Sequence, residues 1–177
     1  NNLYGWWQTI AAGDINGDGK KDLIIGNIGE NFYLRPGKEN PVKLWLNDFD
    51  QSGTMDQFLT RTVDKRDMPV FLKREIAEQF PALKKGNLKH SEYAKKSIRN
   101  LFSKELISQS ATKTFNYCQS VVAINEGNGK FTIQPLPQQT QLSSVNAIAI
   151  TDLNGDKRPD ILSGGNLYNF PPQFGRL

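Results

Sequence analysis

Short apolar runs alternate with turns rich in Asp, Asn and Gly along most of the chain. Three of these turns have the same length and each lies between two strand-like apolar runs. The turns and their flanking runs are 14–22 between 7–13 and 23–27, 48–56 between 42–47 and 57–62, and 152–160 between 145–151 and 161–165. A supersecondary unit that recurs in this way is typical of a stacked or radial architecture.

A fourth hairpin has the strands without the acidic pattern. The apolar runs at 120–125 and 130–134 flank Glu126-Gly-Asn-Gly129, whose glycines can take the positive φ of a tight turn. The sequence therefore predicts strands on both sides of the segment that follows the second loop.

Residues 69–112 break the β pattern. Apolar spacing predicts a helix over 70–80 with Pro69 at its first position, and Ser91 and Ser103 are suited to cap two further helices, through 97–102 and through Leu106-Ile107. We interpret 69–112 as a helical insertion within a blade, between repeats at 1–68 and 113–177. The strand pairs on either side of the helices are expected to form one four-stranded blade.

Composition limits the chemistry. The chain has 177 residues, of which 37% are hydrophobic, so it can bury a core. No apolar run reaches the ~18 residues of a membrane span. A single cysteine, Cys118, excludes an internal disulfide framework, and a single histidine, His90, excludes a multi-histidine metal site. The chain begins at Asn, and we expect it to be a piece of a longer protein.

Charge is distributed unevenly. Residues 61–113 hold thirteen Lys and Arg against six Asp and Glu, which leaves nine basic against twelve acidic residues in the rest of the chain, out of totals of 22 and 18. Nine of those twelve acids lie in the three loops. A basic helical surface can bind a polyanion, here through Lys84, Lys85, Lys89, Lys95, Lys96 and Arg99. A solvated helical face is the simpler interpretation, and nucleic-acid binding is not expected.

The loops carry the donors that Ca²⁺ prefers. The ion takes six to eight oxygen ligands, and a turn with oxygen side chains at positions 1, 3, 5 and 9 and a carbonyl at position 7 can supply most of them. The predicted ligands are Asp14, Asn16, Asp18, the Lys20 carbonyl and Asp22; Asp48, Asp50, Ser52, the Thr54 carbonyl and Asp56; and Asp152, Asn154, Asp156, the Arg158 carbonyl and Asp160. Mg²⁺ is the poorer fit because it demands a tight octahedron.

The sixth position ranks the loops. Gly19 and Gly53 suit the positive φ of that position, whereas Lys157 is strained there. Ser52 is a weaker donor than the Asp of the other loops, so the first loop ranks highest. An EF-hand loop begins with a similar run of acidic residues, but it needs a carboxylate at position twelve and flanking helices. Position twelve is Ile25, Leu59 or Ser163, and the flanks are strand-like, so that alternative is rejected.

These motifs resemble the FG-GAP/VCBS repeats, which also occur in integrin α-subunits. The resemblance rests on Gly13-Asp-Ile-Asn-Gly-Asp-Gly-Lys-Lys-Asp-Leu-Ile-Ile-Gly26, on Thr151-Asp-Leu-Asn-Gly-Asp-Lys-Arg-Pro-Asp-Ile-Leu-Ser-Gly164 and on the turn Asn125-Glu-Gly-Asn-Gly-Lys-Phe131. Gly5-Trp-Trp and Phe80-Pro-Ala-Leu-Lys-Lys85 are similar to the ASPIC/UnbV and CRTAC1-type secreted proteins of Bacteroidetes. Lys157 departs from the glycine usual in the family.

The resemblance implies an all-β fold, a partial β-propeller of about 2.5–3 four-stranded blades with the helical insertion, in which calcium closes the loop between two strands. Blades that do not close a ring leave open strand edges, so we expect self-association through them. The implied function is a calcium-stabilised, non-enzymatic binding or scaffold module for a protein or glycan, located extracellularly, in the periplasm or on the outer-membrane surface.

Two alternatives stay open beside polyanion binding. A glycan-active enzyme would need carboxylates outside the loops, and the spacing of Glu30, Glu39 and Glu126 marks no acid–base pair. Trp6, Trp7 and Trp45 could form a sugar-stacking platform. Adjacent residues of a strand point to opposite faces, however, so at least one of Trp6 and Trp7 is expected in the core.

Overall fold

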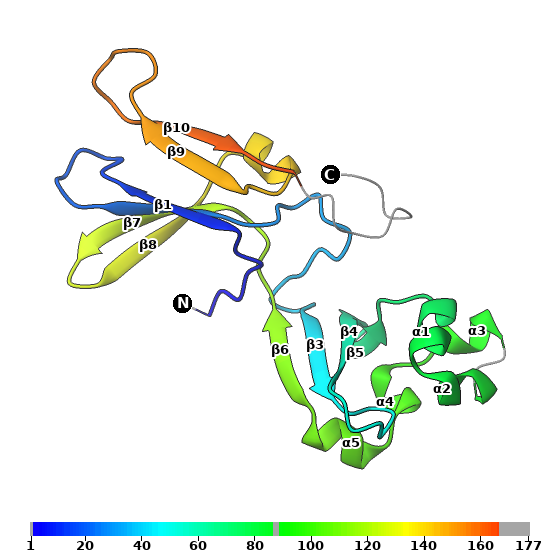
Figure 1. Ribbon diagram of the computed structural model, residues 1–177. Helices are drawn as coiled ribbons and strands as arrows, with labels where there is room; N and C mark the ends of the chain where they lie inside the picture. The colour runs from blue at the N-terminus through cyan, green and yellow to red at the C-terminus, as the bar shows by residue number, and fades with distance from the viewer. Residues whose placement is uncertain (1, 87–88, 167–177) are drawn as a thin grey trace. The chain divides into compact units, whose positions relative to one another are not determined.

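The chain folds into two compact units, one formed by residues 1–35 with 117–177 and the other by residues 36–116. The computed structural model describes residues 2–86 and 89–166 (Figure 1). The second unit is inserted into the first between two neighbouring strands of a sheet. We call them the repeat unit and the inserted unit, and describe each by itself.

The repeat unit contains a four-stranded antiparallel sheet. Its order is β1-β2-β7-β8, from Thr9–Gly13, Asp22–Gly26, Val121–Gly127 and Lys130–Pro135. Ile24 of β2 lies opposite Val122 of β7, although the whole inserted unit separates them in sequence. The expectation that strands 42–47 and 57–62 would pair with 120–125 and 130–134 is wrong. The apolar pattern defines each strand but not its partner, because any two strands with one apolar face can pair.

A second hairpin lies beside this sheet. It consists of β9, Ala147–Thr151, and β10, Asp160–Gly164, and it follows the short helix η1, Gln138–Leu142. A methyl group on Gly13 would approach the Ile150 side chain to 3.0 Å, and one on Gly26 would collide with the Val145 carbonyl. These glycines let β9 and the segment before it approach the sheet closely (Figure 1).

Buried polar groups join the two parts of the repeat unit. Asn27 is fully buried after β2, and its backbone N–H donates to the hydroxyl of Ser120 at 2.9 Å. The Gln141 amide accepts from the Ser120 N–H at 2.8 Å and donates to the Ser120 carbonyl at 2.9 Å. Because buried polar groups left without partners are costly, this network fixes how the chain leaves and re-enters the unit.

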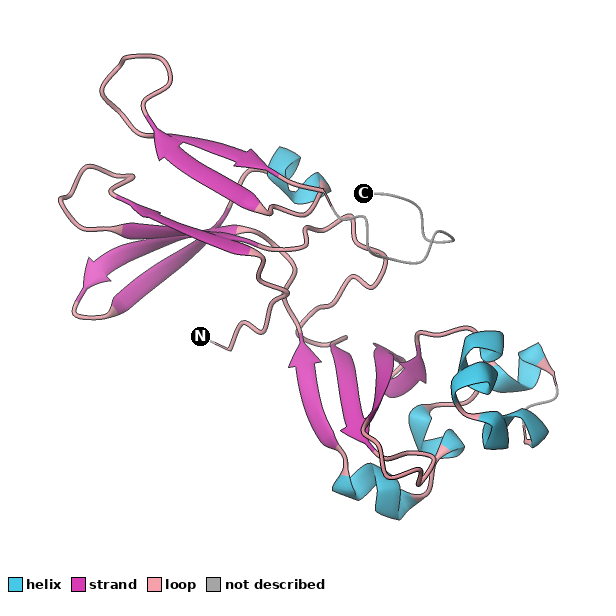
Figure 2. Ribbon diagram, in the orientation of Figure 1, coloured by secondary structure: helices cyan, strands magenta, loops and turns pink. Residues whose placement is uncertain are grey.

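The inserted unit has its own four-stranded sheet. Its order is β5-β4-β3-β6, from Arg66–Pro69, Asp56–Val63, Val42–Asn47 and Ala111–Phe115. Between β5 and β6 the described residues form five short helices: α1 Lys73–Gln79, α2 Pro81–Lys85, α3 His90–Tyr93, α4 Ile98–Leu101 and α5 Lys104–Gln109. All fall within the range predicted for the helical insertion (Figure 2).

The helix boundaries differ in part from those predicted. Pro69 does not begin a helix but ends β5 opposite Thr60. Strand pairing continues past it, since the Val70 N–H donates to the Leu59 carbonyl at 3.1 Å, and α1 begins only at Lys73. The helix predicted from Ser91 is two helices, α3 and α4. Ser103 caps α5 as predicted, accepting from the Leu106 N–H at 3.3 Å.

Aromatic side chains fill the core between this sheet and the helices. Phe58 and Phe80 are 0% and 1% exposed, and their rings lie 6.0 Å apart. Phe102 packs edge-on to Phe58 at 5.3 Å, and Phe49 lies 4.5 Å from Phe102. The core cluster contains only residues of the inserted unit, so this unit buries an apolar core of its own.

The prediction of an antiparallel, mostly β architecture is confirmed, and the α-helices of the described residues all lie in the insertion. Over the described residues the strands form separate sheets, and no sheet closes on itself. The count of 2.5–3 blades therefore stays a prediction. None of the helices in residues 2–86 and 89–166 has the length and apolar character required to cross a membrane.

Candidate metal centres

All three predicted loops share one hydrogen-bonded framework. The carboxylate at position 1 accepts through Oδ2 from the backbone N–H at position 6, and the distance is 2.8 Å each time: Gly19 to Asp14, Gly53 to Asp48 and Lys157 to Asp152. The loops lie in different sheets, so their common geometry comes from the local sequence rather than from shared surroundings.

The side chains at positions 9 and 3 also accept the same hydrogen bonds in all three loops. The carboxylate at position 9 accepts from the N–H at position 2: Ile15 to Asp22 at 3.0 Å, Phe49 to Asp56 at 2.9 Å and Leu153 to Asp160 at 2.9 Å. The side-chain oxygen at position 3 accepts from the N–H at position 5: Asp18 to Asn16, Ser52 to Asp50 and Asp156 to Asn154. Backbone N–H groups thus orient the side chains at positions 1, 3 and 9 in each loop.

The sixth residue has positive φ in every loop. The angles are 81° at Gly19, 86° at Gly53 and 68° at Lys157. A residue with a Cβ is strained in this region, by roughly 1–2 kcal/mol. The predicted strain at Lys157 is therefore present in the backbone of the third loop.

Three carboxylates converge in the second loop. Asp48, Asp50 and Asp56 each offer an oxygen, and these oxygens lie within 4.8 Å of one another, a grouping that the described part of the chain shows only here. In the first loop Asp18 instead contacts the Lys20 ammonium at 3.1 Å. The Ser52 hydroxyl, which weakened the second loop in the predicted ranking, lies 2.8 Å from the Thr54 hydroxyl. The ranking of the loops stays a prediction.

Local hydrogen bonds favour the ionised form of one carboxylate per loop. The hydroxyl and backbone N–H of Ser52 lower the pKa of Asp50, and the backbone N–H of Lys20, followed by its side chain, lowers that of Asp18. The Lys157 N–H lowers the pKa of Asp152. Clustered, ionised oxygen donors are the set that a hard divalent cation requires, so the residues present fit Ca²⁺.

The first loop has a partner that the sequence pattern did not reveal. The buried Asp22 accepts from the Asn125 N–H at 2.8 Å, and the Asn125 side-chain amide donates to the Lys21 carbonyl at 3.0 Å. Asn125 stands at the beginning of the turn motif of the fourth hairpin. That motif could have singled it out, but only the pairing of β2 with β7 shows that it supports the loop.

The three tryptophans do not form one platform. Trp45 is 5% exposed, and its indole N–H donates to the Thr60 hydroxyl at 2.9 Å within the core. Trp6 is only half-buried, edge-on to Phe32, and Trp7 is exposed and lines a groove with Ile10 and Ile25. Neither lies in the core as expected, because β1 begins only at Thr9 and the strand alternation does not reach the pair. Of the remaining carboxylates, Glu30 accepts from the Gln119 amide at 2.8 Å.

Comparison with known proteins identifies one segment. No curated protein and no solved structure matches the chain. One segment of the chain does match a family model: it contains β1, the first loop and β2, and it ends at the first residue of β3. This segment, residues 6–42, matches the family model of the FG-GAP repeat.

Proposed function

We propose that this protein is a calcium-stabilised extracellular interaction module without enzymatic activity. The observation that carries the proposal is the framework that the three loops share, down to the same 2.8 Å hydrogen bond between positions 1 and 6. The FG-GAP repeat match over residues 6–42 includes the first of these loops and supports an integrin-like interaction role.

Calcium would act on stability. Each loop carries three carboxylates between two strands, and in the second loop their oxygens lie within 4.8 Å of one another. A cation bound there would neutralise the repulsion between them. A bound ion adds RT ln(1 + [Ca²⁺]/Kd) to the free energy of unfolding, roughly 2.7 kcal/mol per site at 100 times Kd. The protein's own residues contribute the oxygen donors and hold them in position through the backbone N–H groups.

Calorimetric titration of the EDTA-stripped protein with Ca²⁺ tests this role. We expect up to three sites, and the variants Asp14→Ala, Asp48→Ala and Asp152→Ala should each lose one. Glu105→Ala, an exposed carboxylate of α5 outside the loops, is the matched control and should keep all of them. EDTA should lower the melting temperature by several degrees. Absence of binding heat together with an unchanged melt would refute the proposal.

The unpaired strand edges of the sheets are the candidate partner surfaces. The hairpin β9-β10 has no further strand beside β10 over the described residues, and β8 and β6 are edge strands of their sheets. Unpaired strand edges can bind a strand of another molecule, so we propose self-association through them beside a protein or glycan ligand. Sedimentation at increasing concentration is the test, and a monomer throughout contradicts it.

The finer family and location assignments belong to the same proposal. Gly5-Trp6-Trp7, before β1, and residues 80–85, which include α2, support a relation to the ASPIC/UnbV and CRTAC1-type group. That relation favours secretion, to the periplasm, the outer-membrane surface or the medium. Activity assays on polysaccharides test the competing hypothesis of a glycan-active enzyme. Turnover by the purified protein would support that enzyme and contradict the non-enzymatic role.

A further inference from the structure

A groove crosses the inserted unit between the end of its sheet and the helices α1 to α3. It consists of two hollows of 390 Å³ and 770 Å³ that share Leu72, Lys73 and His90 in their walls. Each hollow by itself lies in the size range of small-ligand sites. None of the predicted metal ligands lines either hollow, so the groove is independent of the calcium loops.

Basic side chains line the groove from three elements. They are Arg61 on β4, Lys73 and Arg74 on α1, and Lys84 on α2. The lining contains one carboxylate, Glu78, which lies 3.7 Å from Arg74. Nearby Glu75 accepts from the Leu72 N–H at 2.7 Å, and Glu92 of α3 is exposed. Basic groups exceed acidic ones in the lining, so the groove favours an anionic ligand.

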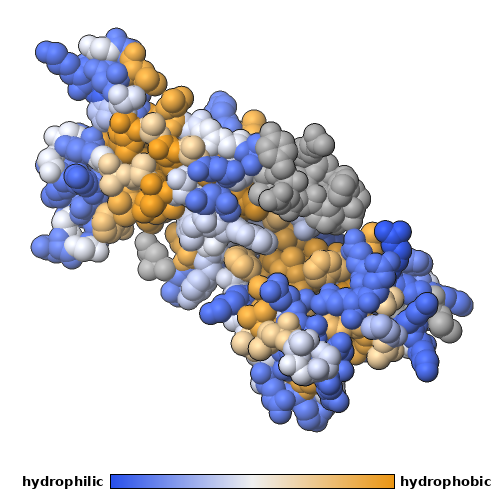
Figure 3. Space-filling model, in the orientation of Figure 1, coloured by the Kyte–Doolittle hydropathy of each residue, from blue (hydrophilic) through white to orange (hydrophobic). Residues whose placement is uncertain are grey.

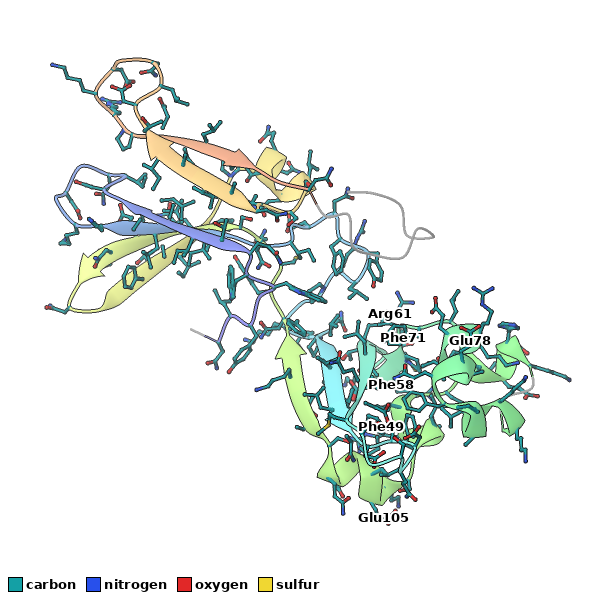
Figure 4. All side chains as sticks on the ribbon, in the orientation of Figure 1. Phe49, Phe58, Arg61, Phe71, Glu78 and Glu105 are labelled. Atoms are coloured by element: carbon teal, nitrogen blue, oxygen red, sulfur yellow. The ribbon has the colours of Figure 1, made fainter. Side chains whose placement is uncertain are left out.

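The wall of the groove is apolar. Leu72 is 53% exposed and Val63 42% exposed, next to the half-buried Met68 and Phe71. The hydroxyl of buried Tyr93 donates to the Phe71 carbonyl at 2.9 Å and holds this wall in place. Figure 4 shows Arg61 near Phe71 at the sheet and Glu78 on the helical side. Figure 3 shows hydrophilic residues gathered over the helices of this unit.

We propose that the groove binds an acidic peptide segment that carries an apolar side chain. Its carboxylates would contact Arg61, Lys73 and Lys84, and its apolar side chain would cover Leu72 and Val63. A nucleic acid or a sulfated polysaccharide satisfies the charge of the groove but carries no branched aliphatic side chain to cover the exposed wall. Charge complementarity and apolar burial together favour the peptide, since burying apolar surface supplies the affinity that exposed ion pairs do not.

The probe is a fluorescein-labelled peptide of alternating Glu and Leu, followed by fluorescence anisotropy. Wild-type protein should bind it, and binding should weaken between about 0.05 M and about 0.5 M salt. The double variant Arg61→Gln/Lys84→Gln should weaken binding about tenfold, and Leu72→Ser should weaken it several-fold. The control Lys104→Gln/Lys113→Gln removes two exposed charges of the same unit outside the groove and should bind like wild type.

Two further peptides and heparin serve as comparison ligands. A Lys–Leu peptide should not bind, and a Glu–Ser peptide should bind several-fold more weakly than the Glu–Leu peptide. Equal weakening by the control variant, equal binding of the Glu–Ser peptide, or no binding by wild type would each overturn the proposal. Groove-dependent binding of heparin without binding of the peptide would overturn the peptide assignment in favour of an anionic polysaccharide.

Folding of the variants is checked separately. Circular dichroism melts should coincide with wild type, because Arg61, Leu72 and Lys84 are exposed. NMR titration of the unmutated protein gives a second readout. Peptide-induced shifts should centre on Lys73, Leu72 and His90, the residues common to both hollows. Shifts confined to other surfaces would contradict the site even if the peptide binds.

Discussion

The Asp22 carboxylate accepts a hydrogen bond from the backbone N–H of Asn125 at 2.8 Å, across 103 residues of sequence. Its other oxygen accepts from the Ile15 N–H at 3.0 Å. One side chain therefore closes the first loop and joins β2 to β7, two strands that the inserted unit separates in sequence. The predicted ninth ligand of the loop is also a structural tie of the sheet.

Replacing Asp22 by Ala should destabilise the repeat unit even without calcium. The change leaves the half-buried N–H groups of Ile15 and Asn125 without their acceptor, which costs about 2–4 kcal/mol in free energy of unfolding. Urea unfolding in EDTA measures the loss. Asp18→Ala is the control: it removes an exposed carboxylate of the same loop and should cost under about 1 kcal/mol. Equal losses would show that Asp22 has no structural role beyond the loop.

Lys157→Gly should stabilise the third loop. Lys157 has φ of 68°, and removing its Cβ relieves backbone strain of about 1 kcal/mol. The reciprocal change Gly53→Ala introduces that strain at φ 86° in the second loop and should destabilise by a similar amount. Thermal melts with and without calcium compare the two. The idea fails if both substitutions shift the melting temperature in the same direction.

Stability should fall as the pH rises past about 9 because of Cys118. Burial, followed by the nearby Glu30 carboxylate, raises the pKa of its thiol. A raised folded-state pKa means that the folded protein holds the proton more tightly, so the stability it contributes is present below the unfolded pKa and is lost as the pH rises through the folded value. Cys118→Ala should flatten the stability profile at the start of that window. An identical profile in the variant would remove Cys118 as the cause, leaving the raised pKa of Tyr117 to act near pH 10.

Replacing residues 36–116 by a flexible linker should leave the repeat unit folded. The strand pairs β1-β2, β2-β7 and β7-β8 all lie within that unit, and the Gly29 N–H donates to the Cys118 carbonyl at 2.8 Å on either side of the insertion. The NMR signals of Asn27, Ser120 and Gln141 should keep their shifts. The inserted unit expressed alone should also fold around Phe58 and Phe80. An unfolded repeat unit would show that the two units stabilise each other.

Local features could be predicted from the sequence because their causes are local. The positive φ of Lys157, the cap at Ser103 and the strands on both sides of each Asp-rich loop depend on residues a few positions apart. The identical loop frameworks in different sheets show the same principle: spacing of Asp, Asn and Gly determines the turn whatever lies around it.

Pro69 and Ser91 mark the limit of such local reasoning. Helical spacing and a proline suited to a first turn predicted the start of a helix, yet strand pairing of β4 with β5 carries the chain past Pro69 before α1 begins. Long-range hydrogen bonding overrides a local preference because propensities differ by only fractions of a kcal/mol per residue. Ser91 does not cap a helix but lies inside α3, and Ser97 occupies the N-cap of the separate helix α4.

The sequence by itself determined the three loops, the oxygen side chains at their predicted ligand positions, the strands around them and the place of the α-helices. Only the tertiary structure decided that β2 pairs with β7, that residues 36–116 form a unit with its own core, and that Asn125 supports Asp22. Turn geometry depends on neighbours in the chain, whereas a strand's partner depends on which apolar faces and buried hydrogen bonds can be satisfied together across the whole fold.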